Sequence, residues 1–503
     1  MLPISTVAQR LALSRRASPG IALAILLLVF GAVWLTVLAG TALVAPVDNI
    51  EQLTWVRSLE WGYYKHPPLP TFLLWLPVHV LGLSGWTSYL LGAAVTLGTM
   101  AILWRLLREL RGTAYATLAL LATLCITYYN GRLYYYNHNI VLMLCSTGIA
   151  WLAWRAFATR QLRWWLAIGA VVGLGGLAKY QIAVTVASLG CFWLAQHGWR
   201  DAVQRRGPIV AAAIALVVLL PHLVWLVRND LPPIRYAMHT SLGVALPAST
   251  RAFAALRWVA DQALNRGLPA LLMLAVADWS AQRSHAAATS DNAPGDRRDA
   301  ARALLISWGA VPLGLMTLMG ATFGSDLQLQ WGTPFLLFLA PCVMELFPRA
   351  AWRRPAPAAV WTTFAGIQTL LIVLTIVTSP VGIKRLMDTH WRTFDAKRFA
   401  ERVAGPARRA LGGPVRVIVG SAAEPGALAL ELPEHPLVLI DGRYDRSPWV
   451  RPETVTSCGA LEIVRSHDPL PDATPFGAPF DGLQWRVIRP MPGSPPCRTP
   501  AAD

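Results

Sequence analysis

The feature that most constrains this chain is a series of apolar runs, each long enough to form a helix across a bilayer. Such a helix needs about 20 mostly apolar residues to cross a hydrocarbon core of about 30 Å. A shorter apolar run at 71–83 is bounded by prolines, and we expect it to lie against the helix bundle. The other runs predict an α-helical polytopic membrane protein with about eleven transmembrane helices, at 21–45, 86–104, 113–129, 138–154, 164–178, 181–195, 208–226, 264–279, 303–321, 334–347 and 357–379.

The composition excludes the two most obvious soluble classes. Only 14% of the residues are charged and 55% are hydrophobic, which leaves too little charge to cover a water-soluble enzyme of 503 residues. The net charge of +17 would suit a nucleic-acid-binding protein. The basic residues, however, stand in small groups between apolar runs instead of forming one patch. The charge therefore predicts a lipid bilayer as partner, and no nucleic acid.

The groups of arginines predict how the chain is oriented in the membrane. Cytoplasmic loops are enriched in Arg and Lys. Arginines are concentrated before the first run and in every second link after it, at 10–16, 105–111, 155–163, 200–206, 283–302 and 349–354. We therefore predict a multi-pass protein of a bacterial inner membrane with a cytoplasmic N-terminus. The intervening links, and everything after residue 380, are then expected on the periplasmic side.

A change in composition near residue 380 divides the chain into two predicted domains. Residues 1–379 form the transmembrane domain, interrupted at 280–302 by a link expected to lack fixed structure. Residues 380–503 are polar and rich in proline, with a helical pattern at 394–411 and β-type runs at 415–419, 437–440, 461–464 and 483–488, which predicts a small periplasmic α/β domain. Its two cysteines, Cys458 and Cys497, are predicted to form a disulfide because the periplasm is oxidising.

The first outer loop, residues 46–70, is the strongest candidate for a site. Asp48 follows the first apolar run directly, and Asp48, Glu51, Gln52 and Trp55 recur at helical spacing. One face of a short helix then carries two carboxylates at the edge of the hydrocarbon, where ionisable groups are costly and are kept mainly when they pair or react. A capped interfacial helix with a belt of aromatic residues explains the same pattern without any chemistry.

The end of this loop favours a binding site. Lys65 and His66 precede Pro67 and Pro68, and two successive prolines fix a rigid extended corner. A corner that directs Lys65 and His66 toward the membrane face suits a phosphate at the level of the lipid headgroups, where a lysine acts as a point charge.

Motifs along nearly the whole chain resemble the bacterial branch of the protein-mannosyltransferase and aminoarabinose-transferase group, which are integral-membrane glycosyltransferases of the GT-C fold (glycosyltransferase family 39-like). Two positions depart from the family pattern: Asn49 stands where the family often has Glu, and His66 stands where the aminoarabinose branch has a lysine before Pro-Pro. The motifs are Asp48 with Glu51-Gln52, Trp-Gly-Tyr-Tyr-Lys-His-Pro-Pro-Leu at 61–69, Tyr-Tyr-Tyr-Asn-His-Asn at 134–139, Gly-Leu-Ala-Lys-Tyr-Gln at 176–181, Pro-His at 221–222, Arg-Asn-Asp at 228–230, Gln-Trp-Gly-Thr-Pro at 330–334 and Asp-Gly-Arg-Tyr-Asp at 441–445.

The resemblance implies inverting transfer of a sugar from a polyprenyl-phosphate donor to an acceptor hydroxyl at the outer face of the membrane. The acceptor stays open between lipid A or lipopolysaccharide, another envelope glycan and a protein. Asp48 matches the catalytic acidic position and is the expected base, with Glu51 as the second carboxylate. A phosphate leaves as an anion, so cations that hold it take the place of a general acid. A divalent metal is compatible with this chemistry, and no other cofactor is expected. The expected donor-binding residues are Arg57, Lys65, His66, Lys179, Tyr180, Arg228 and Tyr136.

Simpler interpretations exist for several of these positions. Lys179, in a tight turn between two runs, also fits a lysine that snorkels to the interface. The tyrosines at 128–136 fit either an aromatic belt or the polar lining of a sugar site, and His138 and His222 are read as structural. The loop at 227–263 is either a lid or a plain surface loop.

The rival function for the whole chain is a polytopic lipid or solute transporter or flippase without transferase activity. Such proteins typically contain internal repeats and ionisable residues near the middle of the membrane. The sequence shows no internal repeat, and its ionisable residues collect at the predicted outer edge, which favours a transferase.

Overall fold

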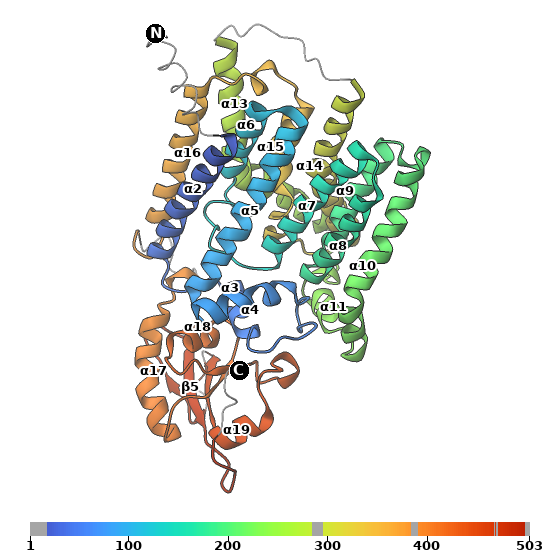
Figure 1. The fold of residues 1–503 in the computed structure, drawn as a ribbon. Helices are drawn as coiled ribbons and strands as arrows, with labels where there is room; N and C mark the ends of the chain where they lie inside the picture. Colours follow the sequence, from blue (N-terminus) through green and yellow to red (C-terminus); the bar gives the residue numbers. More distant parts are fainter. Residues whose placement is uncertain (1–17, 284–294, 384–390, 467, 469–470, 498–503) are drawn as a thin grey trace, which may run out of the picture.

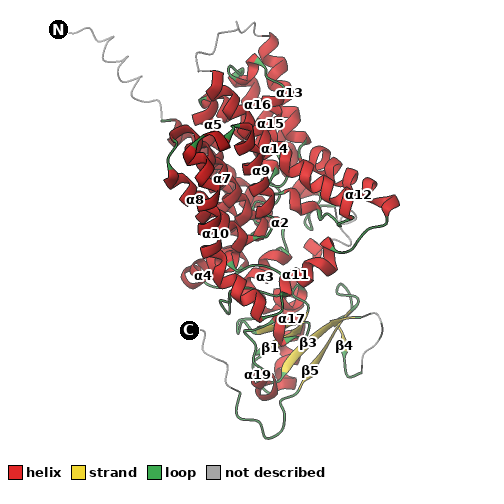
Figure 2. Ribbon diagram, turned by 90° about the vertical axis from the view of Figure 1, so that its right-hand side faces the viewer, coloured by secondary structure: helices red, strands yellow, loops and turns green. Residues whose placement is uncertain are grey.

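The computed structural model describes residues 18–283, 295–383, 391–466, 468 and 471–497. Helices form a large bundle, and a small sheet domain lies against one end of it (Figures 1 and 2). The helices of the first part are α2 (Pro19–Thr41), α3 (Val47–Trp55), α4 (Leu69–Leu81), α5 (Gly85–Arg111), α6 (Thr113–Leu124), α7 (His138–Thr159), α8 (Leu162–Ala178), α9 (Ile182–Ala195), α10 (Ala202–Arg228), α11 (Pro232–Ala237), α12 (Ala248–Ala260), α13 (Leu268–Arg283), α14 (Gly295–Phe323), α15 (Leu339–Leu346) and α16 (Pro357–Val377).

Six helices in the described part of the chain are long and apolar enough to cross a membrane: α2, α5, α7, α10, α14 and α16. The other five predicted spans coincide with α6, α8, α9, α13 and α15, which are shorter, so the total of about eleven crossings stays a prediction. α4 is the short helix expected at 71–83. The unstructured link predicted at 280–302 is too long, because α13 extends to Arg283 and α14 begins at Gly295; its centre, 284–294, lies outside the described residues.

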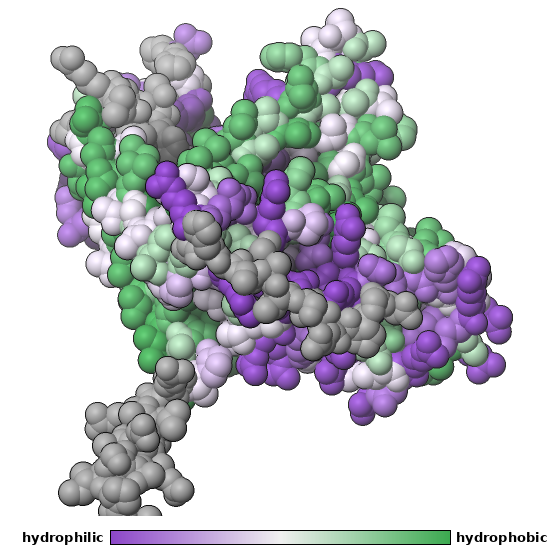
Figure 3. All heavy atoms as spheres, turned by 90° about the horizontal axis from the view of Figure 1, so that it is seen from above, coloured by the Kyte–Doolittle hydropathy of each residue, from purple (hydrophilic) through white to green (hydrophobic). Residues whose placement is uncertain are grey.

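Apolar side chains cover the outside of the bundle, as a surrounding bilayer requires. Leu28 on α2 is 69% exposed and Val217 on α10 is 67% exposed. Large exposed apolar patches of this kind are rare on soluble monomers. Seen from the end opposite the sheet domain, hydrophobic side chains lie along the left and the upper right, and hydrophilic ones extend from the middle to the lower right (Figure 3). The chain is therefore a multi-pass membrane protein.

The C-terminal part is a mixed α/β domain around a five-stranded sheet of order β2-β1-β3-β5-β4. β1 (Val417–Gly420) pairs in parallel with both β2 (Leu437–Ile440) and β3 (Ala460–Arg465), and β5 (Leu483–Ile488) pairs antiparallel with β3 and with the short β4 (Thr474–Pro475). The four predicted β-type runs are confirmed as strands. The helices of this domain are α17 (Ala396–Leu411), α18 (Glu424–Glu431) and α19 (Pro452–Cys458).

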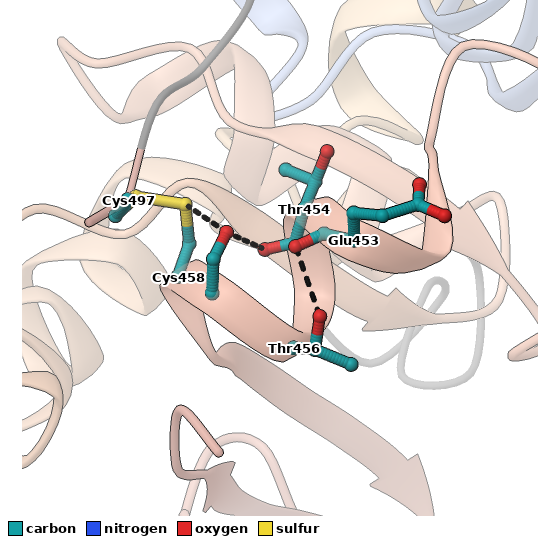
Figure 4. The surroundings of a disulfide bond; sticks show 6 residues. Glu453, Thr454, Thr456, Cys458 and Cys497 are labelled. Carbon is teal, nitrogen blue, oxygen red and sulfur yellow. Dashed lines mark hydrogen bonds between the residues drawn. A yellow bond between two sulfur atoms is a disulfide. The ribbon is translucent and has the colours of Figure 1, made fainter. Parts of the chain in front are cut away.

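The predicted disulfide between Cys458 and Cys497 is present (Figure 4). Cys458 is the last residue of α19, and Cys497 lies close to the end of the described chain. The bond ties the C-terminal segment to the edge of the sheet domain and encloses β3, β4 and β5 in one covalent loop.

The sheet domain packs on the first loop that follows α2. A Cβ atom at Gly426 of α18 would lie 2.4 Å from Cγ2 of Ile50 on α3, so only glycine permits this approach of the two helices. The Arg57 guanidinium donates to the backbone carbonyl of His435 at 2.8 Å. The guanidinium of Arg446 lies 5.1 Å from the ring centre of Tyr64. These contacts fix α3 between the bundle and the sheet domain, as Figure 2 also shows.

Candidate functional site

α3 is held rigidly by the residue that follows Asp48. The side-chain amide of Asn49 donates to Ser88 Oγ and to the carbonyl of Tyr134, both at 2.9 Å, and its oxygen accepts from the backbone N–H of Tyr136 at 2.9 Å. Asn49 is fully buried, so these bonds replace those it would make with water. The residue at which the chain departs from the family pattern is therefore an anchor that points away from the site. Asp48, on the first turn of α3, is left free to face the opposite way.

One cavity of about 480 Å³ brings together most of the predicted site residues. Asp48 and Glu51 enter it from α3, Lys65 and His66 from the loop that follows, and Lys179 and Tyr180 from the turn between α8 and α9. Segments more than 100 residues apart in sequence thus contribute to one wall. The lining also includes apolar residues of α9, α14 and the segment after α11: Ala183, Val184, Leu242, Met316 and Met319.

Asp48 lies where two cavities meet. Its Oδ2 accepts a hydrogen bond from Asn137 Nδ2 at 2.8 Å. Asp48, Asn137 and Gln330 line both the 480 Å³ cavity and a neighbouring one of about 230 Å³. A carboxylate in this position is accessible from two sides, and Asn137 fixes its orientation.

Glu51 is paired with a lysine. Lys65 Nζ donates to both carboxylate oxygens of Glu51 at 3.1 Å, and the Tyr64 hydroxyl donates to Oε1 at 3.2 Å. The lysine ammonium also lies 5.5 Å from the ring centre of Tyr236, which contacts the Tyr64 ring edge-on. Burial opposes the charge on Lys65, but Glu51, Tyr236, Tyr64 and Asp48 together outweigh it and raise the pKa of Lys65 above its ordinary value. Lys65 is therefore a fixed cation.

Lys179 is the second lysine of the cavity, and its hydrogen-bond partner is an uncharged amide, whereas Lys65 is paired with a carboxylate. Its Nζ donates to Asn139 Oδ1 at 2.7 Å and lies 5.5 Å from the ring centre of Trp331. Burial lowers the pKa of Lys179, partly offset by the nearby Asp48. Burial, with Lys179 and Lys65 near by, also holds the pKa of His66 well below its ordinary value, so His66 is neutral.

Two polar atoms in the cavity wall have no hydrogen-bond partner among the described residues. They are Nε2 of His138, whose residue is 5% exposed, and Oε1 of Gln181. Buried polar atoms are nearly always paired, so unpaired ones in a cavity wall indicate a polar ligand. His138, which the sequence analysis reads as structural, packs against Trp55 and His66 and also lines the cavity.

Tyr180 is oriented by a relay through α10. The Tyr180 hydroxyl is 2.9 Å from His222 Nε2, and His222 Nδ1 is 2.6 Å from the backbone carbonyl of Trp61. Because a carbonyl only accepts, Nδ1 of His222 donates, and Nε2 accepts from Tyr180. The relay connects the first loop, α8 and α10.

Three predicted donor-binding residues, Arg57, Tyr136 and Arg228, do not line this cavity. Arg57 bonds to His435 of the sheet domain. Tyr136 is completely buried, and its hydroxyl donates to the carbonyl of Pro70 at 2.6 Å. Arg228 is exposed at the C-terminal end of α10. Arg57 and Tyr136 therefore hold the architecture together.

The sequence reasoning missed the residues that orient the charged groups. Asn137 and Asn139, which bond Asp48 and Lys179, stand in the tyrosine-rich motif that equally fitted an aromatic belt. Tyr236 lies in the loop left open as lid or surface, where Asp230, Leu231 and Ala245 have left-handed backbone conformations. Gln330 and Trp331 also line the cavity, and the Gln-Trp motif at 330–331 is the sequence feature from which their position could have been predicted.

The described residues do not fit a metal site. No three His, Cys, Asp or Glu side chains in that part of the chain come together to hold an ion. In the cavity, Asp48 is bonded to Asn137 and Glu51 is neutralised by Lys65, so the carboxylates are not arranged as a cage of oxygen ligands.

The comparisons with known proteins agree with this geometry. The family model described as dolichyl-phosphate-mannose-protein mannosyltransferase matches residues 65–225. Two curated relatives come from Rhizobium johnstonii. The lipid A galacturonosyltransferase RgtD is 27% identical over 223 residues, which are 42% of this chain and 45% of the relative. The lipopolysaccharide core galacturonosyltransferase RgtA is 24% identical over 311 residues, 58% of each chain. The chain thus spans about half the length of the curated relatives it matches.

Solved structures match over nearly the whole chain. ArnT from Cupriavidus metallidurans bound to undecaprenyl phosphate has a TM-score of 0.57 at 15% identity, covering 93% of this chain and 97% of ArnT. The apo form of the same ArnT gives a TM-score of 0.51 at 17% identity, covering 94% and 98%. The fold is therefore that of the GT-C proteins of the ArnT and protein-mannosyltransferase type, and the predicted resemblance and fold class are confirmed.

Proposed function

We propose that the chain is a membrane glycosyltransferase that moves a sugar from a polyprenyl phosphate to an acceptor hydroxyl. The observation that carries the proposal is one cavity in which Asp48 lies with two lysines, Lys65 and Lys179, and which apolar side chains also line. A donor of this class needs a polar pocket for sugar and phosphate and an apolar surface for the lipid, and the cavity offers both. The curated relatives and ArnT support the same class of reaction.

Asp48 acts as the base. An acceptor hydroxyl that approaches from the 230 Å³ cavity meets the Asp48 carboxylate before it meets a donor in the larger cavity. As the hydroxyl oxygen attacks the anomeric carbon, its proton passes to Asp48, and the bond between that carbon and the phosphate oxygen breaks. Attack from the side opposite the leaving group inverts the configuration.

The two lysines hold the phosphate as it leaves. Negative charge develops on the bridging oxygen, and fixed cations within a low-dielectric cavity stabilise it without reorganisation. Lys65 is kept charged and in place by Glu51, so we assign Glu51 as a positioning residue. Lys179, held by Asn139, supplies the second positive charge. His138 and Gln181, which line the same cavity, are the side chains that we assign to the hydroxyls of the donor sugar.

We further propose that the reaction takes place at the periplasmic face of a bacterial inner membrane, with a cytoplasmic N-terminus. The arginine-rich links lie at the end of the bundle away from Asp48 in the topology that the sequence predicts. The curated relatives act on lipid A and on lipopolysaccharide core, which supports a glycolipid of this class as the acceptor, ahead of another envelope glycan or a protein.

The test is reconstitution of the purified full-length chain in liposomes. The donors are polyprenyl phosphates that carry a uronic acid, a neutral hexose or an amino sugar, and the acceptors are lipid A and lipopolysaccharide. We expect mass spectrometry to detect transfer from one donor class, and Asp48→Asn to reduce the rate by about 10²–10⁴-fold.

A matched control shows whether loss of transfer is specific to Asp48 or follows from the removal of any carboxylate. Asp230→Asn changes an exposed carboxylate whose left-handed backbone conformation asparagine tolerates well, and we expect it to leave transfer unchanged. Full activity of Asp48→Asn would overturn the base assignment. If the lipid moves across the bilayer and its sugar is not transferred, the chain is a flippase and the proposed transferase function is wrong.

A further inference from the structure

A second large cavity, of about 590 Å³, lies between the outer end of the membrane helices and the sheet domain. Val44, Val47 and Ile50 form its wall on the side of α2 and α3. Glu424 and Arg465 line it from the sheet domain. The mechanism proposed above makes no use of this space.

The cavity opens at the position where α/β sheets usually bind ligands. β1 lies between β2 and β3, and the chain passes through α18 to one neighbour and through α19 to the other. Ligands of open parallel sheets bind at such a switch point, outside the carboxyl ends of the strands. Glu424 follows the carboxyl end of β1, and Arg465 is the last residue of β3. Both therefore stand at the switch point.

The lining combines an ion pair with aromatic rings. The Arg465 guanidinium donates to the Glu424 carboxylate, which also accepts from Ser421 Oγ at 2.9 Å. Burial raises the pKa of Glu424, but the Arg465 ion pair, the bond from Ser421 and a backbone N–H together outweigh it and lower the pKa below its ordinary value, so the carboxylate stays ionised. The Arg465 side chain remains 60% exposed. Phe394 and Phe480 contribute ring faces and edges to the wall.

This combination recognises a saccharide. Carboxylate and guanidinium groups exchange charge-assisted hydrogen bonds with hydroxyl groups, and aromatic rings pack against the apolar C–H face of a sugar ring. A purely lipidic ligand would make no use of the polar groups at this wall, and the phosphates of a nucleotide would meet the carboxylates of Glu424 and Asp481.

The cavity adjoins the smaller cavity that reaches Asp48. Val47 and Trp391 line both this cavity and the 230 Å³ cavity, which reaches Asp48. Trp391 also contacts Tyr135 edge-on, with ring centres 6.4 Å apart, at the wall of the smaller cavity. A glycan seated at the sheet domain is thus next to the cavity from which a hydroxyl would approach Asp48.

We propose that this cavity is a binding subsite for the non-reacting saccharide of the acceptor, with Glu424 and Arg465 as specificity-determining residues. The inference rests on the proposed function and extends it: the sheet domain selects the acceptor. The donor binds elsewhere, so the subsite acts on the acceptor KM alone.

The test compares the full-length chain with Arg465→Gln and with a control, Arg486→Gln. Arg486 pairs with Glu462 across β3 and β5 in the same sheet and does not line the cavity. The first readout is calorimetric binding of a lipopolysaccharide core oligosaccharide freed of its lipid. The second is the acceptor KM and the donor KM in liposomes. We expect Arg465→Gln to weaken oligosaccharide binding and raise the acceptor KM by about tenfold or more, with the donor KM unchanged. We expect Arg486→Gln to behave as the unmodified chain.

A charge-swapped variant distinguishes recognition from a structural ion pair. Glu424→Arg combined with Arg465→Glu keeps the pair but reverses it, and we expect binding to stay weak. Recovery of binding in the swapped variant, or normal binding by Arg465→Gln, would overturn the subsite. Oligosaccharide binding by a chain that transfers no sugar would count against the proposed function while supporting the subsite. Sugar transfer by Arg465→Gln with an unchanged acceptor KM would support the proposed function and count against the subsite.

Discussion

Glu51→Gln tests whether the second carboxylate of α3 positions Lys65 or performs chemistry itself. Both carboxylate oxygens of Glu51 accept from Lys65 Nζ at 3.1 Å, and Tyr64 adds a bond at 3.2 Å. Glutamine keeps the shape of the side chain but removes its charge, and it presents an amide N–H₂ group to an ammonium. The substitution therefore leaves a buried cation without its counter-charge.

The cost follows from the burial of the pair. Removing one partner of a buried ion pair destabilises a protein by about 3–5 kcal/mol. The Glu51 side chain is 5% exposed, but that of Lys65 is 22% exposed and keeps some hydration, so we expect the lower end, about 3 kcal/mol. The Lys65 pKa, which Glu51 raises, falls in the variant. A donor phosphate then supplies the missing negative charge, so it stabilises the variant more than the unmodified chain.

The assay is the melting temperature of the purified chain in detergent, with and without polyprenyl phosphate. We expect a lower melting temperature for Glu51→Gln and a larger gain on adding the lipid. The double variant Glu51→Gln with Lys65→Met removes both charges, and we expect it to recover much of the lost stability and none of the response to phosphate. Glu60→Gln, a carboxylate of the same loop bonded to Ser58 at 2.6 Å, is the control.

One result would refute this reasoning. If Glu51→Gln melts like the unmodified chain and loses transfer to the extent expected for Asp48→Asn, then Glu51 is itself a base, and the ion pair is incidental.

Three further variants test the surroundings of the site. Asn49→Asp replaces a buried amide, which donates to a backbone carbonyl, by a carboxylate that repels this carbonyl. We expect a loss of about 3 kcal/mol in unfolding free energy and no gain in transfer rate. A more active enzyme would contradict the anchoring role of Asn49. Gly426→Leu forces α18 away from Ile50 and should lower the melting temperature by the equivalent of about 1–3 kcal/mol, whereas Gly405→Ala, whose added methyl meets its nearest neighbour at 3.4 Å, should not. Because burial lowers the pKa of Lys179, we expect its charge to be lost at a lower pH than for an exposed lysine, and the donor KM to increase as the pH rises. Lys179→Arg stays charged and should abolish this increase in KM. If the increase persists in Lys179→Arg, the titrating group is not Lys179.

The parts of the fold that the sequence predicted are those with local signals. Apolar runs located every long helix, and the alternating runs after residue 410 located β1, β2, β3 and β5. The clustering of Asp48, Glu51, Lys65 and Lys179 was predictable because each stands in a motif next to the end of an apolar run. A residue next to the end of a membrane-spanning run lies near the surface of the bilayer, so residues at the ends of several runs on the same side lie at the same depth.

The direction of a side chain at that level was not predictable. Arg57 and Lys65 lie eight residues apart in one loop, yet one reaches the sheet domain and the other the cavity, because the packing of α18 on α3 decides the outcome. Asn49 and Asp48 are neighbours with opposite roles for the same reason: one helix position faces the bundle and the next faces the cavity. The subsite between the domains has no sequence signal at all, since its walls come from segments about 380 residues apart.

The disulfide between Cys458 and Cys497 gives the acceptor end of the molecule its own maturation step. The covalent loop contains Arg465 and Phe480, and closing a loop of this length contributes about 4 kcal/mol by restricting the unfolded chain. In the proposed periplasmic location of the sheet domain, half of the proposed acceptor subsite is completed by an oxidation that follows export of this domain. A chain made under reducing conditions is expected to insert its helices and form the donor cavity, while the part that selects the acceptor is still incomplete.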